Sequence, residues 1–121
     1  AKTPGFILFL VLDNVLNDYA KILLALESYC DEMDAHLRTF NHKNHYRMVT
    51  RMKREAIRSK RFLAAIKDML MRISGRKITV VSEPCRKSLV DLYSHSQALV
   101  AESDSIRELL NGMLDQIDNN I

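Results

Sequence analysis

Asp91 and His95 are the two residues whose types and spacing come closest to a metal site. They are four positions apart in a segment of helical periodicity, so their side chains would be neighbours on one helix face, with Glu102 on the same side. Carboxylate oxygens are ligands for Mg²⁺, whereas an imidazole nitrogen suits Co²⁺ or Zn²⁺. Two ligands are too few for a closed site, so the others would have to come from another helix or subunit. A surface Asp–His pair without a metal ion is the alternative.

Small and acidic residues share a second face of the same segment. At about 100° per residue they fall within about 80° of one another, roughly opposite the apolar positions. They are Ser94, Ala101, Ser105, Glu108, Gly112 and Asp115. Small side chains interrupted by acids suggest close approach to a symmetry axis that cations reach, and a plain solvent-exposed face is the alternative.

Histidines and cysteines elsewhere are weaker candidates. His36, His42 and His45 surround an expected turn and could bind Zn²⁺ or Ni²⁺ adventitiously. Their spacing matches no known motif, so we favour a solvated loop. Cys30 and Cys85 lie far apart at apolar positions and form no CxxC pair. We expect two free, buried thiols, which fits a reducing compartment.

The sequence gives no indication of an enzyme. It has no glycine-rich phosphate loop and no Ser/His/Asp or Cys/His set with catalytic spacing. The basic run from Arg47 to Arg61 could bind nucleic acid or acidic lipid, but it contains few aromatic residues, and the net charge of the chain is only +3. A salt-bridged, solvent-exposed face is the favoured interpretation of this run, with no nucleic-acid partner.

Three long helices would position all of these residues. Only 3 Gly and 2 Pro occur in 121 residues, so turns are few and elements are long. Thr3-Pro4 and Ser82-Glu83-Pro84 are typical helix starts, and residues 41–44 are an expected break. We predict an all-α segment over residues 1–121, with helices at about 4–37, 45–73 and 83–118.

Each predicted helix carries an apolar seam with alternating spacings of three and four residues, the pattern of helix-to-helix packing. The seams run from Phe9 to Leu37, from Met52 to Ile73 and from Cys85 to Ile117. The first two helices would form a long hairpin. The charged residues of the first are mostly acidic and those of the second mostly basic, which would select the register of the pair. The third, ~54 Å long at ~1.5 Å per residue, would project from the hairpin or continue into another segment.

The seams also predict self-association, because one hairpin and one helix cannot bury all three of them. No apolar stretch reaches the ~20 residues of a membrane span, and Asp13 interrupts the longest run, Phe6 to Leu12. The sequence begins at Ala1 rather than Met, which suggests a piece of a longer protein.

Four segments, in order along the chain, resemble the CorA-type divalent metal ion transporters. Leu10–Tyr19 is similar to the family's LIDALVDDYF, and Lys53–Leu70 is similar to its LKR…LR+…PLR+VL helix. Ser88–His95 resembles FRDVYDH, and Ile106–Asp115 resembles FRDIVSGLLD at the family's separation. The resemblance covers essentially the whole chain.

This resemblance implies a homopentameric, channel-like transporter of Mg²⁺, or of Co²⁺ or Zn²⁺, in the cell (inner) membrane. The chain would be its cytoplasmic gating and metal-sensing part, with the third helix leading into the pore; alone, it could form another oligomer. Asp91 matches the aspartate of an interface site that senses cytoplasmic Mg²⁺, His95 matches its neighbouring histidine, and Asp13 matches an acid of a second interface site. Gly112 and Asp115 match positions that line the cytoplasmic pore mouth.

The sequence also departs from the family pattern. Ser94 stands where the family has a second aspartate, and helix 45–73 is basic where well-known members are acidic. The family's N-terminal α/β part, its two membrane helices and its Gly-Met-Asn signature would lie outside these residues. The resemblance fixes neither the ion nor its direction. A free-standing helical-hairpin adaptor, binding partner helices through the seam of the third helix, is the alternative function.

Overall fold

The computed structural model describes residues 4–36, 42–75 and 83–119, and all of them are helical. Helix α1 spans Pro4–His36, α2 spans His42–Gly75 and α3 spans Glu83–Asn119. The prediction of an all-α fold with three helices is confirmed. Helix α2 begins three residues earlier than expected, because His42, Lys43 and Asn44 include no proline or glycine that would stop it. Helix α2 ends at Gly75, two residues later than expected, and residues 37–41 and 76–82 lie outside the described residues.

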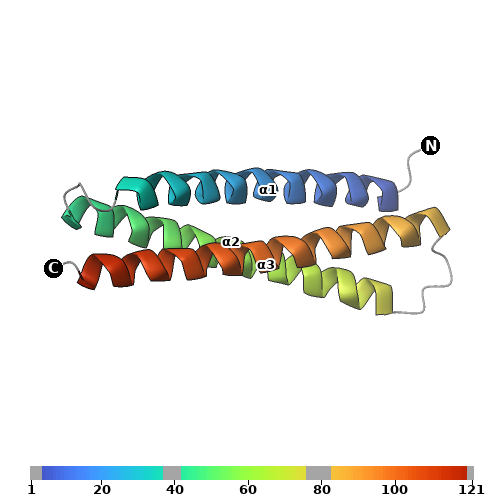
Figure 1. Ribbon diagram of the computed structural model, residues 1–121. Helices are drawn as coiled ribbons and strands as arrows, with labels where there is room; N and C mark the ends of the chain where they lie inside the picture. Colours follow the sequence, from blue (N-terminus) through green and yellow to red (C-terminus); the bar gives the residue numbers. More distant parts are fainter. Residues whose placement is uncertain (1–3, 37–41, 76–82, 120–121) are drawn as a thin grey trace.

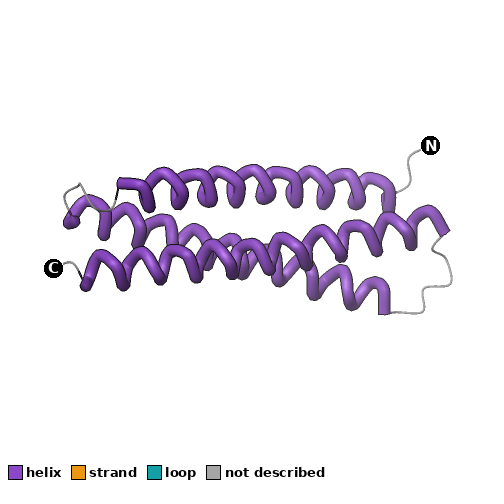
Figure 2. The backbone as a smooth tube through the Cα atoms, viewed as in Figure 1, coloured by secondary structure: helices purple, strands orange, loops and turns teal. Residues whose placement is uncertain are grey.

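The three helices lie side by side in an elongated bundle (Figure 1). Helices α1 and α3 run in the same direction and α2 runs against both, so the end of α1, the start of α2 and the end of α3 meet at one end of the bundle (Figures 1 and 2). Helix α3 is the longest, with 37 residues. It is therefore ~55 Å long at ~1.5 Å per residue and spans the whole bundle.

The core is formed by the apolar seams that the sequence predicts. The residues of these seams that are buried are Leu12, Leu16, Leu23, Cys30, Met33, Met52, Ala56, Ser59, Leu63, Ile66, Leu70, Leu92, Ser96, Leu99, Ser103, Ile106, Leu110, Met113 and Ile117. Val49 extends the α2 seam by one position toward its start. Burial of one stripe on each helix fixes the rotation of all three helices, and so decides which residues face outward.

Helices α2 and α3, rather than α1 and α2, form the most closely packed pair. Small seam residues, Ser59 on α2 and Ser96 and Ser103 on α3, are almost completely buried and let the two backbones approach. The Ser96 hydroxyl donates to the Tyr93 carbonyl oxygen (2.7 Å) and the Ser103 hydroxyl to that of Leu99 (2.9 Å), so their burial leaves no unpaired donor. The expected hairpin of the first two helices is therefore not the main packing unit.

Helix α1 packs mainly on α3 and touches α2 less extensively. One α1–α2 contact is the stack of the Tyr19 and Phe62 rings, with centroids 5.0 Å apart and planes at 18°. The expected charge pairing of these two helices is wrong: within the described ranges, no ion pair joins an acid of α1 to an arginine of α2. The reason is geometric, since most of the α2 arginines lie on the side of that helix that faces away from the core.

Candidate functional site

Asp91 and His95 lie in the first third of α3, beside its buried seam. Leu92 and Ser96 alternate with them and are almost completely buried, which holds α3 in a fixed rotation. Asp91 is consequently exposed and His95 is half-buried. Their four-residue spacing on a continuous helix places both side chains on one face. This face is open to a ligand that approaches from outside the chain.

Asp13 lies half-buried on α1, next to the buried Leu12. Because α1 and α3 are parallel and start at the same end of the bundle, Asp13, Asp91 and His95 all lie toward that end (Figure 1). They do not form a closed site. Across the described parts of the three helices, no three His, Cys, Asp or Glu side chains come together to hold a metal ion. A metal ion at Asp91 would therefore need ligands from another chain or segment.

The histidine cluster near the first break falls partly outside the structure that is described. His45 is half-buried near the start of α2, while the side chains of His36 and His42 are not among those described. The metal-binding alternative for these three residues remains a prediction.

Gly112 and Asp115 are both exposed near the end of α3. A groove of about 620 Å³ between α1 and α3 passes Gly112. A Cβ atom added to Gly112 would meet nothing within 4 Å, so packing inside the chain does not require glycine at this position. A glycine in a helix interior costs about 1 kcal/mol relative to alanine, and contacts within the chain do not offset that cost.

Asp31 and Asp34 of α1 line the same groove as Glu108 of α3. Glu108 belongs to the small and acidic face predicted from the sequence, but its proximity to the two α1 acids was not predicted. The missing information was the parallel packing of α1 and α3, which brings the end of one beside the end of the other. The available signal in the sequence was that the charged residues near the ends of both segments are all acidic.

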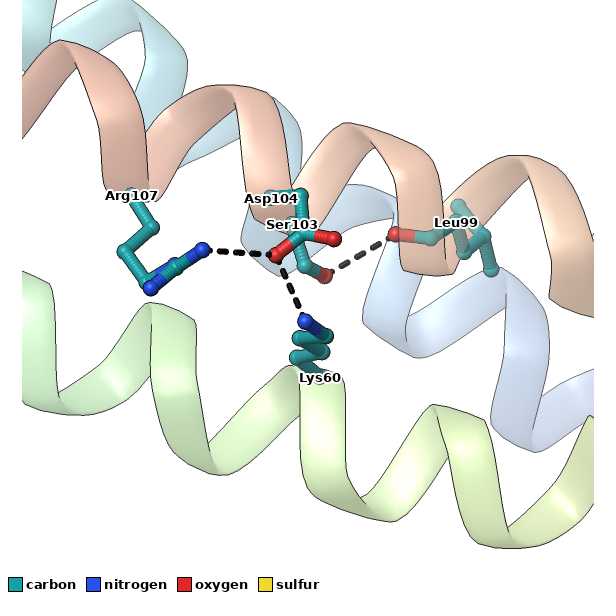
Figure 3. Close-up of polar contacts among 5 residues, drawn as sticks. All are labelled: Lys60, Leu99, Ser103, Asp104 and Arg107. Atoms are coloured by element: carbon teal, nitrogen blue, oxygen red, sulfur yellow. Dashed lines mark hydrogen bonds and ion pairs between the residues drawn. The ribbon is translucent and has the colours of Figure 1, made fainter.

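Asp104 joins α3 to α2 at the middle of the bundle. Its Oδ1 atom lies 2.8 Å from Lys60 Nζ and 3.4 Å from Arg107 Nη2, as Figure 3 shows. The hydrogen bond from Lys60, together with the positive charges of Lys60 and Arg107, lowers the pKa of Asp104. This contact was not predicted. It fixes the register of α2 on α3, and we see no ligand role for a carboxylate already held by two cations.

The two cysteines are free thiols in different environments. Cys30 is buried, as predicted, whereas Cys85 is only half-buried. Burial raises the pKa of Cys30, and the nearby Asp31 and Glu27 carboxylates raise it further. Cys30 is thus a core residue and a poor nucleophile.

The described residues thus form a bundle of three long helices with candidate ligands on their outer faces. The whole chain, residues 1–121, matches the sequence model of the family described as CorA-like Mg²⁺ transporter protein. The chain belongs to this family. The members of this family are membrane-associated transporters of Mg²⁺ and Co²⁺ and not enzymes. The match confirms the resemblance to the family that the sequence motifs indicate.

A relative in Methanocaldococcus jannaschii, "Cobalt/magnesium transport protein CorA", is 23% identical over 111 residues. The alignment covers 92% of this chain but only 35% of that protein, so the chain spans about a third of the relative's length. No solved structure matches the chain significantly. Of the three helices described, none is long and apolar enough to cross a membrane.

Proposed function

We propose that this chain is the ion-sensing and gating part of a divalent cation transporter, with Asp91 and His95 as its sensing site. The observation that carries the proposal is the exposed Asp91–His95 face of α3 in a chain of this family. No three potential ligands come together there among the described residues, so the face has too few ligands to close a site alone. It suits an ion shared between copies of the chain.

The mechanism follows from repulsion between like charges. A divalent ion that bridges Asp91 to acids of a neighbouring copy offsets the repulsion between carboxylates and favours a closed, symmetric assembly. Loss of the ion at low internal concentration leaves the carboxylates facing one another and loosens the interface. Asp13 lies toward the same end of the bundle and would contribute a second bridging position.

The end of α3 would line the route of the ion. Gly112 and Asp115 are exposed there, and Gly112 has no packing role inside the chain. In the parent protein we expect a homopentamer in the cell (inner) membrane, with this chain on the cytoplasmic side. Mg²⁺ or Co²⁺ would be the transported and regulatory ion, because the relative is named for both and the family for Mg²⁺, and Zn²⁺ is a further candidate.

The free-standing adaptor loses its structural basis. That alternative requires an apolar seam on α3 that is open to partner helices. The seam residues from Leu92 to Ile117 are instead buried within the bundle. The α3 seam is therefore occupied by the chain itself.

Transport by the full-length parent protein tests the proposal. In proteoliposomes, Asp91→Ala should make uptake less sensitive to internal Mg²⁺, with the half-inhibitory concentration raised about tenfold, because one bridging ligand per copy is lost. Asp68→Ala is the matched control, since Asp68 is an exposed acid on α2 that belongs to no proposed site. If Asp91→Ala kept the wild-type dependence on internal Mg²⁺, the sensing role would be excluded.

A further inference from the structure

Three arginines near the start of α2 form an exposed basic cluster on the outward side of that helix. Their spacing of four and three residues places them within about 60° of one another, opposite the buried seam. The arginine cluster consists of Arg47, Arg51 and Arg54, all of them exposed. No ion pair within the described helices involves any of the three, whereas Arg58, one turn further along, pairs with Glu55 (2.9 Å). The cluster is therefore available to an anionic partner outside the chain.

The arginine cluster lies at the end of the bundle where α3 ends. The ion pair between Lys60 and Asp104 fixes the register of the antiparallel helices α2 and α3. Arg47 precedes Lys60 by thirteen residues, and Ile117 follows Asp104 by thirteen residues. Both residues thus lie ~20 Å from the ion pair, on the same side of it, at ~1.5 Å per residue. Arg47 is consequently level with Ile117, in the last described turn of α3.

Helices α1 and α3 contribute only acids to this end of the bundle. Neither Lys nor Arg occurs from residue 22 to the end of α1, or from residue 108 to the end of α3. The exposed acids in the last two turns of these helices are Asp31, Glu32, Asp34, Asp115 and Asp118. An anionic surface beside this end would repel α1 and α3, and it would attract the bundle only through α2.

Large apolar side chains flank the arginine cluster. Tyr46 is 47% exposed and Met48 is 49% exposed, and they lie on either side of Arg47. Tyrosine is enriched where membranes meet water, because its ring is apolar and its hydroxyl is polar. Arginine can bury its aliphatic stem there, while the guanidinium group forms two parallel hydrogen bonds with a phosphate. This combination suits a phospholipid headgroup layer better than a nucleic acid, whose phosphate backbone has no apolar layer beneath it.

We propose that the arginine cluster binds the acidic headgroups of a phospholipid bilayer that lies beyond the end of α3. The position of the bilayer rests on the proposed function, in which α3 leads toward the membrane. The attraction of an anionic leaflet falls off within about 10 Å. The arginine cluster spans ~10 Å along the helix axis, whereas Arg61 is ~21 Å from Arg47 and contributes little. Because α2 packs closely on α3, the contact holds the end of α3 at a fixed distance from the bilayer.

Sedimentation of this chain with lipid vesicles, in EDTA, tests the inference. We expect binding to vesicles of equal parts phosphatidylglycerol and phosphatidylcholine, and binding should weaken as NaCl rises. Arg47→Glu with Arg51→Glu should weaken it at least tenfold, because one arginine near an anionic surface strengthens binding about fivefold. The matched control, Arg72→Glu with Lys87→Glu, makes the same charge change at exposed positions near the opposite end of the bundle. It should bind more tightly than the cluster variant and close to the wild type.

Hydrogen exchange of the parent protein in nanodiscs tests where the contact lies. A peptide covering residues 45–55 should exchange more slowly in nanodiscs that contain phosphatidylglycerol than in phosphatidylcholine alone, because a lipid contact opposes local opening of the first turns of α2. A peptide covering residues 65–74 should exchange equally in both. The variant Arg47→Glu with Arg51→Glu should lose the difference at residues 45–55, and circular dichroism should show that its helix content is unchanged.

Four results would overturn the inference. They are equal binding to vesicles of phosphatidylcholine alone, a control as weak as the cluster variant, equal slowing of exchange in both peptides, and cluster-dependent binding of single-stranded RNA without binding to vesicles. The last result would assign the arginine cluster to a nucleic acid. The vesicle assay contains no divalent ion and does not involve Asp91. Its failure and a failure of the Asp91→Ala transport experiment are therefore distinguishable.

Discussion

The α2–α3 pair and helix α1 differ in how completely they bury their apolar surface. Helices α2 and α3 pack along almost their whole length, through small residues and the Lys60–Asp104 ion pair. Helix α1 has a well-buried seam but leaves eight large apolar side chains exposed, against five on α2 and two on α3. Five of the eight, Phe6, Ile7, Leu8, Leu10 and Val11, lie in its first two turns. The α2–α3 pair is therefore the stable unit of the chain, and α1 is an addition to it.

This difference reflects the sequence of each helix. Helix α2 alternates a narrow apolar seam with charged residues, so burial of one stripe covers its seam and leaves five large apolar side chains exposed. The start of α1 is apolar on every side, and a single neighbour covers only part of it. We therefore expect α1 to be less stable and more dynamic than the α2–α3 pair.

Truncation of a buried leucine should destabilise the α2–α3 pair more than α1. Leu63 of α2 and Leu23 of α1 are both fully buried. We expect Leu63→Ala to cost about 3–5 kcal/mol and Leu23→Ala about 2–3 kcal/mol, because a helix with fewer neighbours can shift to fill the cavity. Urea denaturation measures both. Leu24→Ala is the control, since Leu24 is 61% exposed, and it should change stability by less than about 0.5 kcal/mol. Equal losses of unfolding free energy for Leu63→Ala and Leu23→Ala would contradict the expected difference between α1 and the α2–α3 pair.

The seams could be predicted from the sequence because a heptad pattern specifies which residues are buried. Among the described residues, every buried position except Val49 lies on the predicted three- and four-residue spacing. Which helices pair most closely could not be predicted, since any seam can pack against any other. The sequence suggested α1 with α2 from their charges, but screened surface charges do not outweigh close packing.

Only those features of the candidate site that lie on a single helix could be predicted from the sequence. Asp91 and His95 share one face because of their spacing, and the structure shows that face to be open. The link between Asp31 or Asp34 and Glu108 requires the parallel arrangement of α1 and α3, which lies beyond any local pattern. Ligands contributed by a second copy are beyond the reach of one chain's sequence or fold.

Amide hydrogen exchange should distinguish the start of α1 from the α2–α3 pair by their exchange rates. The backbone amides in the first turns of α1 should exchange about tenfold or more faster than those at the centres of α2 and α3, because local opening there exposes little additional buried surface. Mass spectrometry of peptides covering Phe6–Leu16 and Ala56–Leu63 measures this ratio. Similar protection in both peptides at protein concentrations where the chain is monomeric would show that α1 is as stable as the pair it packs on.

The smallest expected effect concerns the ion pair that joins α2 to α3. Lys60 and Asp104 are each about one-third exposed, at 37% and 36%, so screening by solvent limits the contribution of their interaction. We expect Asp104→Asn to lower the free energy of unfolding by about 0.5 kcal/mol at pH 7. A double-mutant cycle with Lys60→Met isolates the coupling between the two side chains and should give most of that loss.

The pH dependence of the difference between wild type and Asp104→Asn follows from the sign of the pKa shift. Lys60 and Arg107 hold the pKa of Asp104 in the folded chain below its ordinary value. The carboxylate therefore stabilises the fold above the unfolded pKa of about 3.9, and that contribution is lost as the pH falls through the lowered folded value. Unfolding by urea at pH 7 and at pH 2–3 should show the wild-type advantage at neutral pH and its disappearance in acid. An advantage that persists unchanged at low pH would mean that Asp104 contributes through shape or packing rather than through its charge.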